Sequence, residues 1–318
     1  MSGLSGRSSL EIEVWPACPY RLPSRGRRDG VLRSSGGVLT RLLHVGDDPV
    51  VVHCWQRRDG AVAIRAIPAA GEAAAEALER AVELMRFALA VDDDLRPFYA
   101  EFKRDPFLGP AIRRRPWLRP KRRPVAWEAL AWAITEQLIE SSRAAGIQRR
   151  IVHRWGRESG WKGRGTERRP LRDAPAAHVV AGLAPAQLAS CDLAPARAVA
   201  LVKCAREVAS GRADPADPAG DARFERISEI GPWTLQCLGL FGRGEPDSLP
   251  AGDLAYVKLV GVTAGLGRRA TVAEVEEFYA RFAPYRGLAG VFSLSNYSSA
   301  RSLARGLPMA PDFYADAA

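Results

Sequence analysis

Hydrophobic periodicity changes along this chain, from the two-residue alternation of strands to the three-to-four-residue spacing of helices. Near the start, "LEIEVW" alternates apolar residues with Glu11 and Glu13, a pattern that predicts a half-buried strand. The segments "PVVVHCW" and "AVAIRAI" predict two further strands joined by a turn at Asp59-Gly60. The first part of the chain is therefore expected to form an antiparallel sheet.

One long helix is expected to follow these strands. The stretch 68–89 is rich in Ala and Glu and places Leu78, Val82, Met85 and Leu89 at three-to-four spacing. That spacing is typical of an amphipathic helix that packs one face on a core. We expect residues 1–92 to form a small α+β domain.

Helical patterns dominate the rest of the chain, so the predicted fold class is mainly α. The segment from residue 92 to 124 has too many prolines for one long helix and is predicted to be a connector. The run "VAWEALAWAITEQLIESSRAAGIQRRIVHRWG" predicts a long helix, and the polar stretch 157–173 predicts a surface loop. Shorter helices separated by turn residues should complete an all-helical domain over residues 93–318.

The charge balance is basic. The chain has 46 Lys and Arg against 36 Asp and Glu, a formal net charge of +10 and a pI near 9.8. Such an excess suits a polyanionic partner, nucleic acid first, although an Arg-rich proteome with a solvated basic surface gives the same composition. Beside a nucleic-acid site, the arginines of 113–123 and 149–169 would be phosphate contacts; elsewhere such runs are solvated faces.

The supply of metal ligands is poor. Five scattered cysteines, never in C-x-x-C spacing, and four dispersed histidines argue against zinc, iron–sulfur clusters and a disulfide framework. We therefore expect a reducing cytosol and no metal or other cofactor. No apolar run is long enough to cross a membrane, and the N-terminus has no signal-peptide pattern.

The stretch "ISEIGPWTLQ", residues 227–236, predicts a tight turn between two helices. A helix ends near Ile227, Gly231 lies in the turn, and Pro232 occupies a favourable first position of the next helix. Turns of this kind expose backbone N–H groups beside a helix N-terminus, where the helix dipole also favours an anion. The same residues would serve as ordinary punctuation between helices.

A single carboxylate, Asp253, follows twenty residues after Trp233 and directly precedes an apolar helix. Asp is a preferred N-cap residue, a role worth about 1 kcal/mol. At the mouth of a cleft the same carboxylate would stabilise positive charge and orient a water molecule. The residue pattern leaves both interpretations open.

These motifs carry a resemblance to a known family. The segment "ISEIGPWTLQCLGLFGRGEPDSLPAGDLAYVKLVG" resembles the helix–hairpin–helix and Gly-Pro-Asp region of the base-excision DNA glycosylase superfamily, above all its 3-methyladenine glycosylase II branch. "WEALAWAITEQLIESSRAA", "LAPARAVALVKCAREVASG" and "RFAPYRGLAGVFSL" resemble three further helices of the family. The similarity extends from about residue 10 to 295.

The resemblance implies a monofunctional DNA glycosylase that hydrolyses the N-glycosidic bond of damaged, above all alkylated, bases in base-excision repair. Asp253 aligns with the catalytic carboxylate, which stabilises an oxocarbenium-like sugar and assists water. Trp233, Cys237 and Leu294 align with the base pocket. The target nucleotide would leave the stack before cleavage.

The resemblance also assigns five DNA-binding positions, which are Gln137, Leu138, Ile230, Gly231 and Thr234. Leu138 would enter the duplex where the extruded nucleotide was, although its spacing fits a core residue equally well. Trp233 occupies the position of the Schiff-base Lys of bifunctional members, and indole is no amine nucleophile, so lyase chemistry on oxidised purines is disfavoured. Its alternative role is a core aromatic.

The implied partner is double-stranded DNA, bound by a monomer in the cytoplasm at the nucleoid, with no membrane association. Three residues depart from the family pattern. Glu229 stands where the hairpin usually has Gly, and Cys237 and Leu294 replace aromatic residues. A carboxylate in the hairpin repels phosphate and a side chain there restricts φ. These departures favour an alternative function, a non-catalytic DNA-binding or damage-recognition protein on the same scaffold.

Overall fold

The computed structural model describes residues 8–159, 161 and 170–295, and its first layer is a five-stranded antiparallel sheet. Its strands are β1 (Leu10–Val14), β2 (Leu32–Ser35), β3 (Val38–Val45), β4 (Asp48–Gln56) and β5 (Val62–Pro68), in the spatial order β1-β5-β4-β3-β2. The three strands expected from alternation are confirmed, and Gln56 pairs with Val62 across the predicted turn.

The hairpin of β2 and β3 was not among the predicted elements. Ser35 pairs with Val38, so the two-residue turn consists of Gly36 and Gly37, both at positive φ. Two consecutive left-handed residues suit the right-handed twist of a hairpin, and glycine adopts them without steric cost. The pair "GG" before an apolar run was therefore a usable signal.

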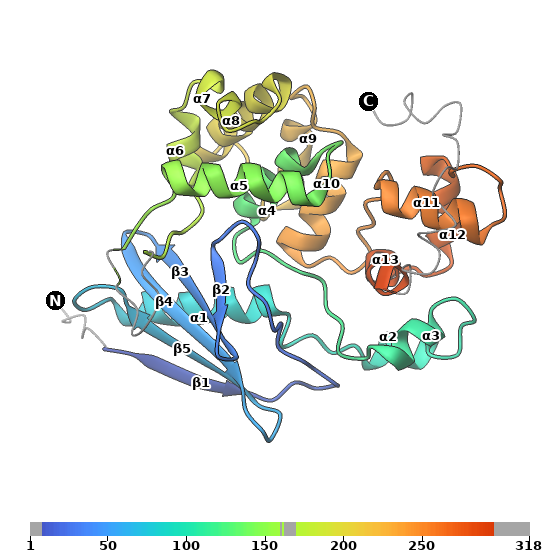
Figure 1. Ribbon diagram of the computed structural model, residues 1–318, viewed down its shortest axis with the longest axis horizontal. Helices are drawn as coiled ribbons and strands as arrows, with labels where there is room; N and C mark the ends of the chain where they lie inside the picture. The colour runs from blue at the N-terminus through green and yellow to red at the C-terminus, as the bar shows by residue number, and fades with distance from the viewer. Residues whose placement is uncertain (1–7, 160, 162–169, 296–318) are drawn as a thin grey trace.

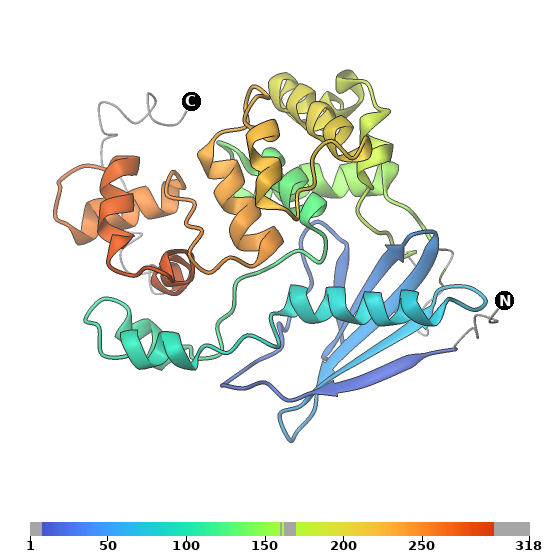
Figure 2. The ribbon, with the colours of Figure 1, turned by 180° about the vertical axis from the view of Figure 1, so that it is seen from behind.

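Helix α1 (Ala75–Leu89) covers one face of the sheet, as Figures 1 and 2 show. Its predicted apolar residues Leu78, Val82, Met85 and Leu89 are all buried in one cluster with the inward-facing residues of the strands. The helix begins at Ala75 rather than near residue 68, because β5 runs on to Pro68.

The helices beyond the sheet form two separate cores. The first core contains α4 (Ala126–Glu136), α5 (Ser141–Trp155), α6 (Ala177–Ala181), α7 (Pro185–Ala189), α8 (Pro195–Ala209), α9 (Asp221–Phe224) and α10 (Pro232–Leu238), with short turns at η1 (Pro218–Gly220) and η2 (Gly239–Arg243). The second contains α2 (Arg96–Phe102), α3 (Gly109–Arg114), α11 (Leu254–Thr263), α12 (Val272–Ala280) and α13 (Arg286–Ser295). The chain passes from the first core to the second between η2 and α11.

Two predictions for the helical part were wrong in detail. The segment predicted as a connector contains α2 and α3, whose Phe98 and Phe102 pack on Phe282 and Phe292 of the second core. The long helix expected from residue 125 onward is two helices, separated by a break in which Leu138 has φ of 53°. A left-handed residue cannot continue a right-handed helix.

Buried ion pairs join the sheet to α4. Arg41 of β3 contacts Glu128 of α4, and both residues are 2% exposed. Asp173 accepts a second contact from Arg41 at 3.4 Å. Asp29 forms an ion pair with Arg123, just before α4. Charges withdrawn from water in this way need partners, so these contacts fix the sheet against the first helical core.

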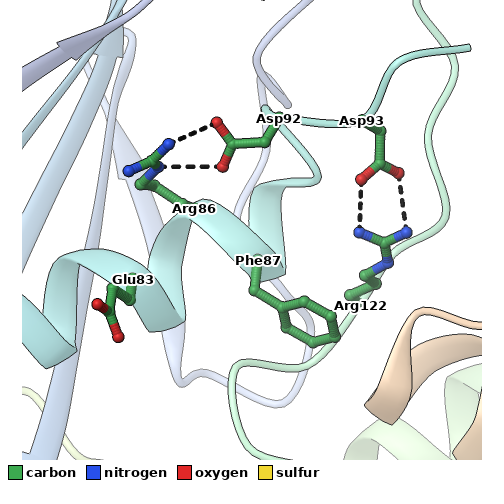
Figure 3. Close-up of a pocket in the computed structure, with 6 residues that line it drawn as sticks. All are labelled: Glu83, Arg86, Phe87, Asp92, Asp93 and Arg122. Carbon is green, nitrogen blue, oxygen red and sulfur yellow. Dashed lines mark hydrogen bonds and ion pairs between the residues drawn. The ribbon is translucent and has the colours of Figure 1, made fainter.

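A second charged junction borders a pocket of about 240 Å³ near the end of α1, shown in Figure 3. Arg86 pairs with Asp92, and Arg122 forms two hydrogen bonds with Asp93 while its guanidinium lies over the ring of Phe87. Both arginines are thus paired within the protein. The pocket lies between the end of α1 and the extended segment that precedes α4.

Candidate functional site

Asp253 is the N-cap of α11, as one of the two interpretations of the sequence predicts. Its carboxylate accepts a hydrogen bond from Ala255 N at 2.8 Å, and its own N–H donates to Pro250 O at 2.9 Å. Burial raises the pKa of Asp253 above its usual value, while hydrogen bonds from Ala255 N and the Trp233 side chain act in the opposite direction. The capping role therefore does not exclude a chemical one.

Helix α10 lies beside the loop that carries Asp253. Gln236 of α10 accepts a hydrogen bond from Ala251 N at 3.2 Å, and its carbonyl accepts one from Ser248 Oγ at 3.0 Å. A Cβ atom on Gly252 would lie 3.8 Å from Cβ of Trp233. Trp233 is half-buried at this contact, and its side chain lies near enough to the Asp253 carboxylate to lower the pKa of that group. Trp233 and Asp253 are therefore brought together.

Cys237 lies one turn further along α10 and is 6% exposed. Burial raises the pKa of its thiol well above the usual range, and the nearby charges of Glu136 and Asp253 raise this pKa further. Tyr256 in the first turn of α11 is buried, and its pKa is raised by burial and then by the neighbouring Tyr279, Asp253 and Cys237. Cys237 is therefore close to Asp253, on the face of α10 toward α11.

The turn between α9 and α10 has an uncommon backbone. Glu229 has φ of 76°, a left-handed conformation, and Ile230 N donates to Ile227 O at 3.0 Å. Ile230 is buried, and Gly231 is the N-cap of α10. The preceding helix α9 ends at Phe224 rather than near Ile227. Burial lowers the pKa of Arg197, and the nearby Glu229 carboxylate partly offsets this decrease. The Arg197 guanidinium therefore lies near the Glu229 carboxylate of the hairpin.

Gln137 fastens the end of α4 to this hairpin. Its Nε2 donates to the Glu229 carbonyl at 2.6 Å and to Thr234 Oγ1 at 2.9 Å. Thr234 is buried on α10. The next residue, Leu138, is 81% exposed and holds φ of 53°. Its core alternative is thereby excluded, because the side chain projects into solvent beside the hairpin.

Leu294 of α13 is partly buried against the second core. It also packs against Leu259, as do Phe107 and Val262. Leu259 and Val262 follow Asp253 by one to three helical turns along α11, so this contact is on the far part of that helix. Its assignment to the base pocket stays a prediction.

Several arginines of the basic run 113–123 are structural. Arg119 and Arg122 are buried, and Arg123 is paired with Asp29 and Glu128. These three side chains are committed to contacts within the protein, whereas Arg113 and Arg114 are exposed. Of the second basic stretch, residues 160 and 162–169 lie outside the described part of the chain.

Glu136 is the residue that sequence reasoning missed. It is the last residue of α4 and its carboxylate accepts a hydrogen bond from Gln148 Nε2 at 2.9 Å. Its position directly before Gln137, at the end of a mostly apolar helix, was the available signal. Within residues 8–159, 161 and 170–295, no group of three or more His, Cys, Asp or Glu side chains could hold a metal ion.

Comparison with known proteins shows which solved structures share this fold. No family model matches the chain. A curated DNA-3-methyladenine glycosylase of Bacillus subtilis (strain 168) is 25% identical over 193 residues, which are 59% of this chain and 62% of the relative. The match thus spans less than two thirds of that relative's length. The 3-methyladenine DNA-glycosylase of Archaeoglobus fulgidus superposes with a TM-score of 0.75 at 18% identity, covering 92% of this chain and 99% of that one.

By fold, the chain is similar to the helix–hairpin–helix DNA glycosylases. Two further structures share this glycosylase fold. MBOgg1 in complex with a low-affinity DNA ligand gives a TM-score of 0.70 at 16% identity, covering 95% of this chain and 98% of the other. The 8-oxoguanine glycosylase/lyase of Clostridium acetobutylicum, in complex with double-stranded DNA, gives 0.66 at 14% identity, covering 86% and 89%.

The superfamily resemblance seen in the motifs is therefore confirmed. The small sheet with α1 and the two helical cores all lie within the glycosylase fold, because the superposition covers nearly the whole chain. Among the described residues, no helix has the length and apolar character needed to span a bilayer.

Proposed function

We propose that this protein is a monofunctional DNA glycosylase that removes damaged, alkylated bases from duplex DNA in base-excision repair. The observation that carries the proposal is the position of Asp253, which lies between the two helical cores and contacts Trp233. Gln137 joins the hairpin and α10 to the segment that carries the exposed Leu138.

The proposed mechanism uses Asp253 as the only residue that acts on the sugar. Once the damaged nucleotide is extruded, the ionised carboxylate stabilises the positive charge that develops at C1′ as the base leaves. It then orients a water molecule toward the same carbon. Interactions with Ala255 N and the Trp233 side chain lower the pKa of this carboxylate and so favour its ionised form, in opposition to the larger effect of burial.

Trp233 supports hydrolysis without strand cleavage. A bifunctional glycosylase needs an amine that forms a Schiff base with C1′, and indole has no such group. Trp233 instead offers a π face on which a cationic base would be stabilised. Main-chain N–H groups of the hairpin would bind the phosphate backbone of the DNA. The protein would bind duplex DNA as a monomer.

Base release and strand cleavage distinguish the proposal from its alternatives. Duplexes with one N-methylated purine, hypoxanthine, uracil or 8-oxoguanine are incubated with the protein, and abasic sites are counted after alkaline cleavage. We expect release of the methylated purine, no strand cleavage without alkali, and a fall in rate of at least about 100-fold for Asp253→Asn. Kd for duplex DNA should change little.

A non-catalytic damage-recognition protein is the second candidate, and the Glu229 carboxylate in the hairpin is the observation that favours it. Retained DNA binding with no base release across the whole panel would establish it. An Asp253→Asn variant that excises at the wild-type rate would disprove the assignment of the carboxylate.

A further inference from the structure

A second carboxylate, Glu136, lies beside the proposed site and has no part in the mechanism above. It closes α4, immediately before Gln137 and the exposed Leu138. Its side chain is partly exposed, so one side of it is open to solvent or to a bound molecule. The question is what holds this carboxylate and what it faces.

A buried amide orients Glu136. Nε2 of Gln148 donates to Glu136 Oε1 at 2.9 Å and to Thr135 Oγ1 at 3.0 Å. Gln148 is 2% exposed and Thr135 is fully buried, so both hydrogens of this amide are committed. Across the described residues, Glu136 Oε2 accepts no hydrogen bond. One oxygen is thus fixed by the protein and the other is left as a preorganised acceptor.

Helix α10 lies between this carboxylate and Asp253. On one side, Thr234 accepts from Gln137, the neighbour of Glu136, at 2.9 Å. On the other side, Gln236 accepts from Ala251 N in the Asp253 loop at 3.2 Å. Figures 1 and 2 show α10 between α4 and the group of α11 and α13.

The buried Cys237 thiol reports on both carboxylates. After burial itself, the charges of Glu136 and Asp253 are the causes that raise its pKa. Because the segments that carry both acids contact α10 through hydrogen bonds, both carboxylates lie near this helix, where the resemblance puts the base pocket. Cys237 is too small to offer a π face there, so a cationic base needs another source of attraction.

We propose that Glu136 is a specificity-determining residue of the base pocket, whose free oxygen selects cationic N-alkylated purines over neutral bases. This inference rests on the proposed function. A carboxylate attracts a positively charged base and accepts a charge-assisted hydrogen bond from its N–H groups. A neutral deaminated base receives only the ordinary hydrogen bond, so the discrimination comes from charge.

The test compares two substrates in three proteins. The kcat/KM for base release is measured on one duplex carrying an N7-methylguanine and on the same duplex carrying hypoxanthine. Glu136→Gln keeps an oxygen for Gln148 but removes the charge. Glu140→Gln is the matched control, because Glu140 is an exposed carboxylate one turn further along the chain.

We expect Glu136→Gln to lower kcat/KM on the methylated purine by about 10- to 100-fold, the effect of a charge-assisted hydrogen bond. Release of hypoxanthine should change less than about threefold, and Glu140→Gln should change neither rate. An equal loss on both substrates would show that Glu136 acts only through Gln148, and an unchanged ratio would also overturn the inference. A wild-type protein that releases no base would overturn the proposed function itself.

Discussion

At the scale of single residues, Asp253 combines a structural and a proposed chemical task in one carboxylate. It caps α11 through Ala255 N, and it is held in a site that disfavours its charge. Leu138 is the reverse case. Its apolar side chain is exposed to solvent, and its backbone has a positive φ. The burial of the Asp253 charge and the exposure of Leu138 are both unfavourable, and residues kept in unfavourable states tend to cluster at functional sites.

Replacing Asp253 with Asn should stabilise the protein at neutral pH. Because the pKa of Asp253 is raised, the folded protein keeps its proton to a higher pH than the unfolded chain, and ionisation lowers stability as pH rises above about 3.9. Asn caps a helix as well as Asp but carries no charge. We expect Asp253→Asn to have the higher Tm at pH 7, with the difference shrinking as pH falls through the raised pKa toward the ordinary one.

Thermal unfolding followed by circular dichroism between pH 7 and pH 4 measures this difference. Asp217→Asn is the control, since Asp217 is an exposed cap that accepts from Ala219 N in the same way. A Tm for Asp253→Asn at or below that of the wild type at pH 7 would contradict the account of its burial.

Substitutions at Leu138 should separate stability from activity. Leu138→Ala keeps the backbone and removes an exposed side chain, so the free energy of unfolding should change by less than about 0.5 kcal/mol. Base release should fall at least about tenfold if the side chain fills the space of the extruded nucleotide. Val199→Ala, at another exposed apolar residue, is the control. Wild-type activity in Leu138→Ala would exclude the wedge.

At the scale of elements, the α9–α10 hairpin is where local preference and structure disagree most. Glu229 has a left-handed backbone conformation that glycine adopts freely. The Gln137 side chain donates a hydrogen bond to the Glu229 carbonyl in this turn. The break after α4 is the counterpart of this turn, because Gln137 and Leu138 leave the helix to reach it. Hairpin and break therefore form one unit, held by two hydrogen bonds from one amide.

Glu229→Gly should improve both stability and DNA affinity. Removing Cβ at φ of 76° relieves about 1 kcal/mol of backbone strain. Loss of the carboxylate leaves Arg197 available to a phosphate, so Kd for duplex DNA should decrease. Glu229→Gln serves as the matched variant that removes charge alone. Fluorescence-anisotropy titration measures Kd, and unchanged affinity in both variants would place the hairpin away from the DNA.

At the scale of the whole molecule, the chain crosses between its two helical cores twice. Residues of α2 and α3 belong to the core of α11–α13, and the intervening helices build the first core. The return crossing between η2 and α11 carries Asp253. The sheet with α1 is fixed to the first core by the Arg41–Glu128 pair, so the proposed site depends on three packed units.

Glu128→Gln should destabilise the whole protein. The change leaves the buried Arg41 with only its longer contact to Asp173, and breaking a buried ion pair costs about 3–5 kcal/mol. Urea unfolding gives the free energy. Glu83→Gln, in an exposed pair with Arg80, should leave the midpoint nearly unchanged. Equal midpoints for the two variants would show that the junction is not a stabilising contact.

Local patterns in the sequence determined the local structure well. Alternation identified β1, β4 and β5, helical spacing identified the buried face of α1, and the residue type at 253 predicted a helix cap. The motifs around Gly231 and Pro232 pointed to the glycosylases whose fold the chain shares. Each of these signals depends on neighbours within about one turn of chain, where periodicity and backbone preference act directly.

Only the tertiary structure decided which distant residues meet. Contacts between remote segments bring α2 and α3 into one core with α11–α13. Such contacts also decide the internal positions of Arg119, Arg122 and Arg123 and the position of Leu294. Periodicity reports that a side chain is apolar or charged, but not which partner satisfies it. Glu136 was missed for the same reason, because its neighbours Gln148 and Cys237 come from other helices.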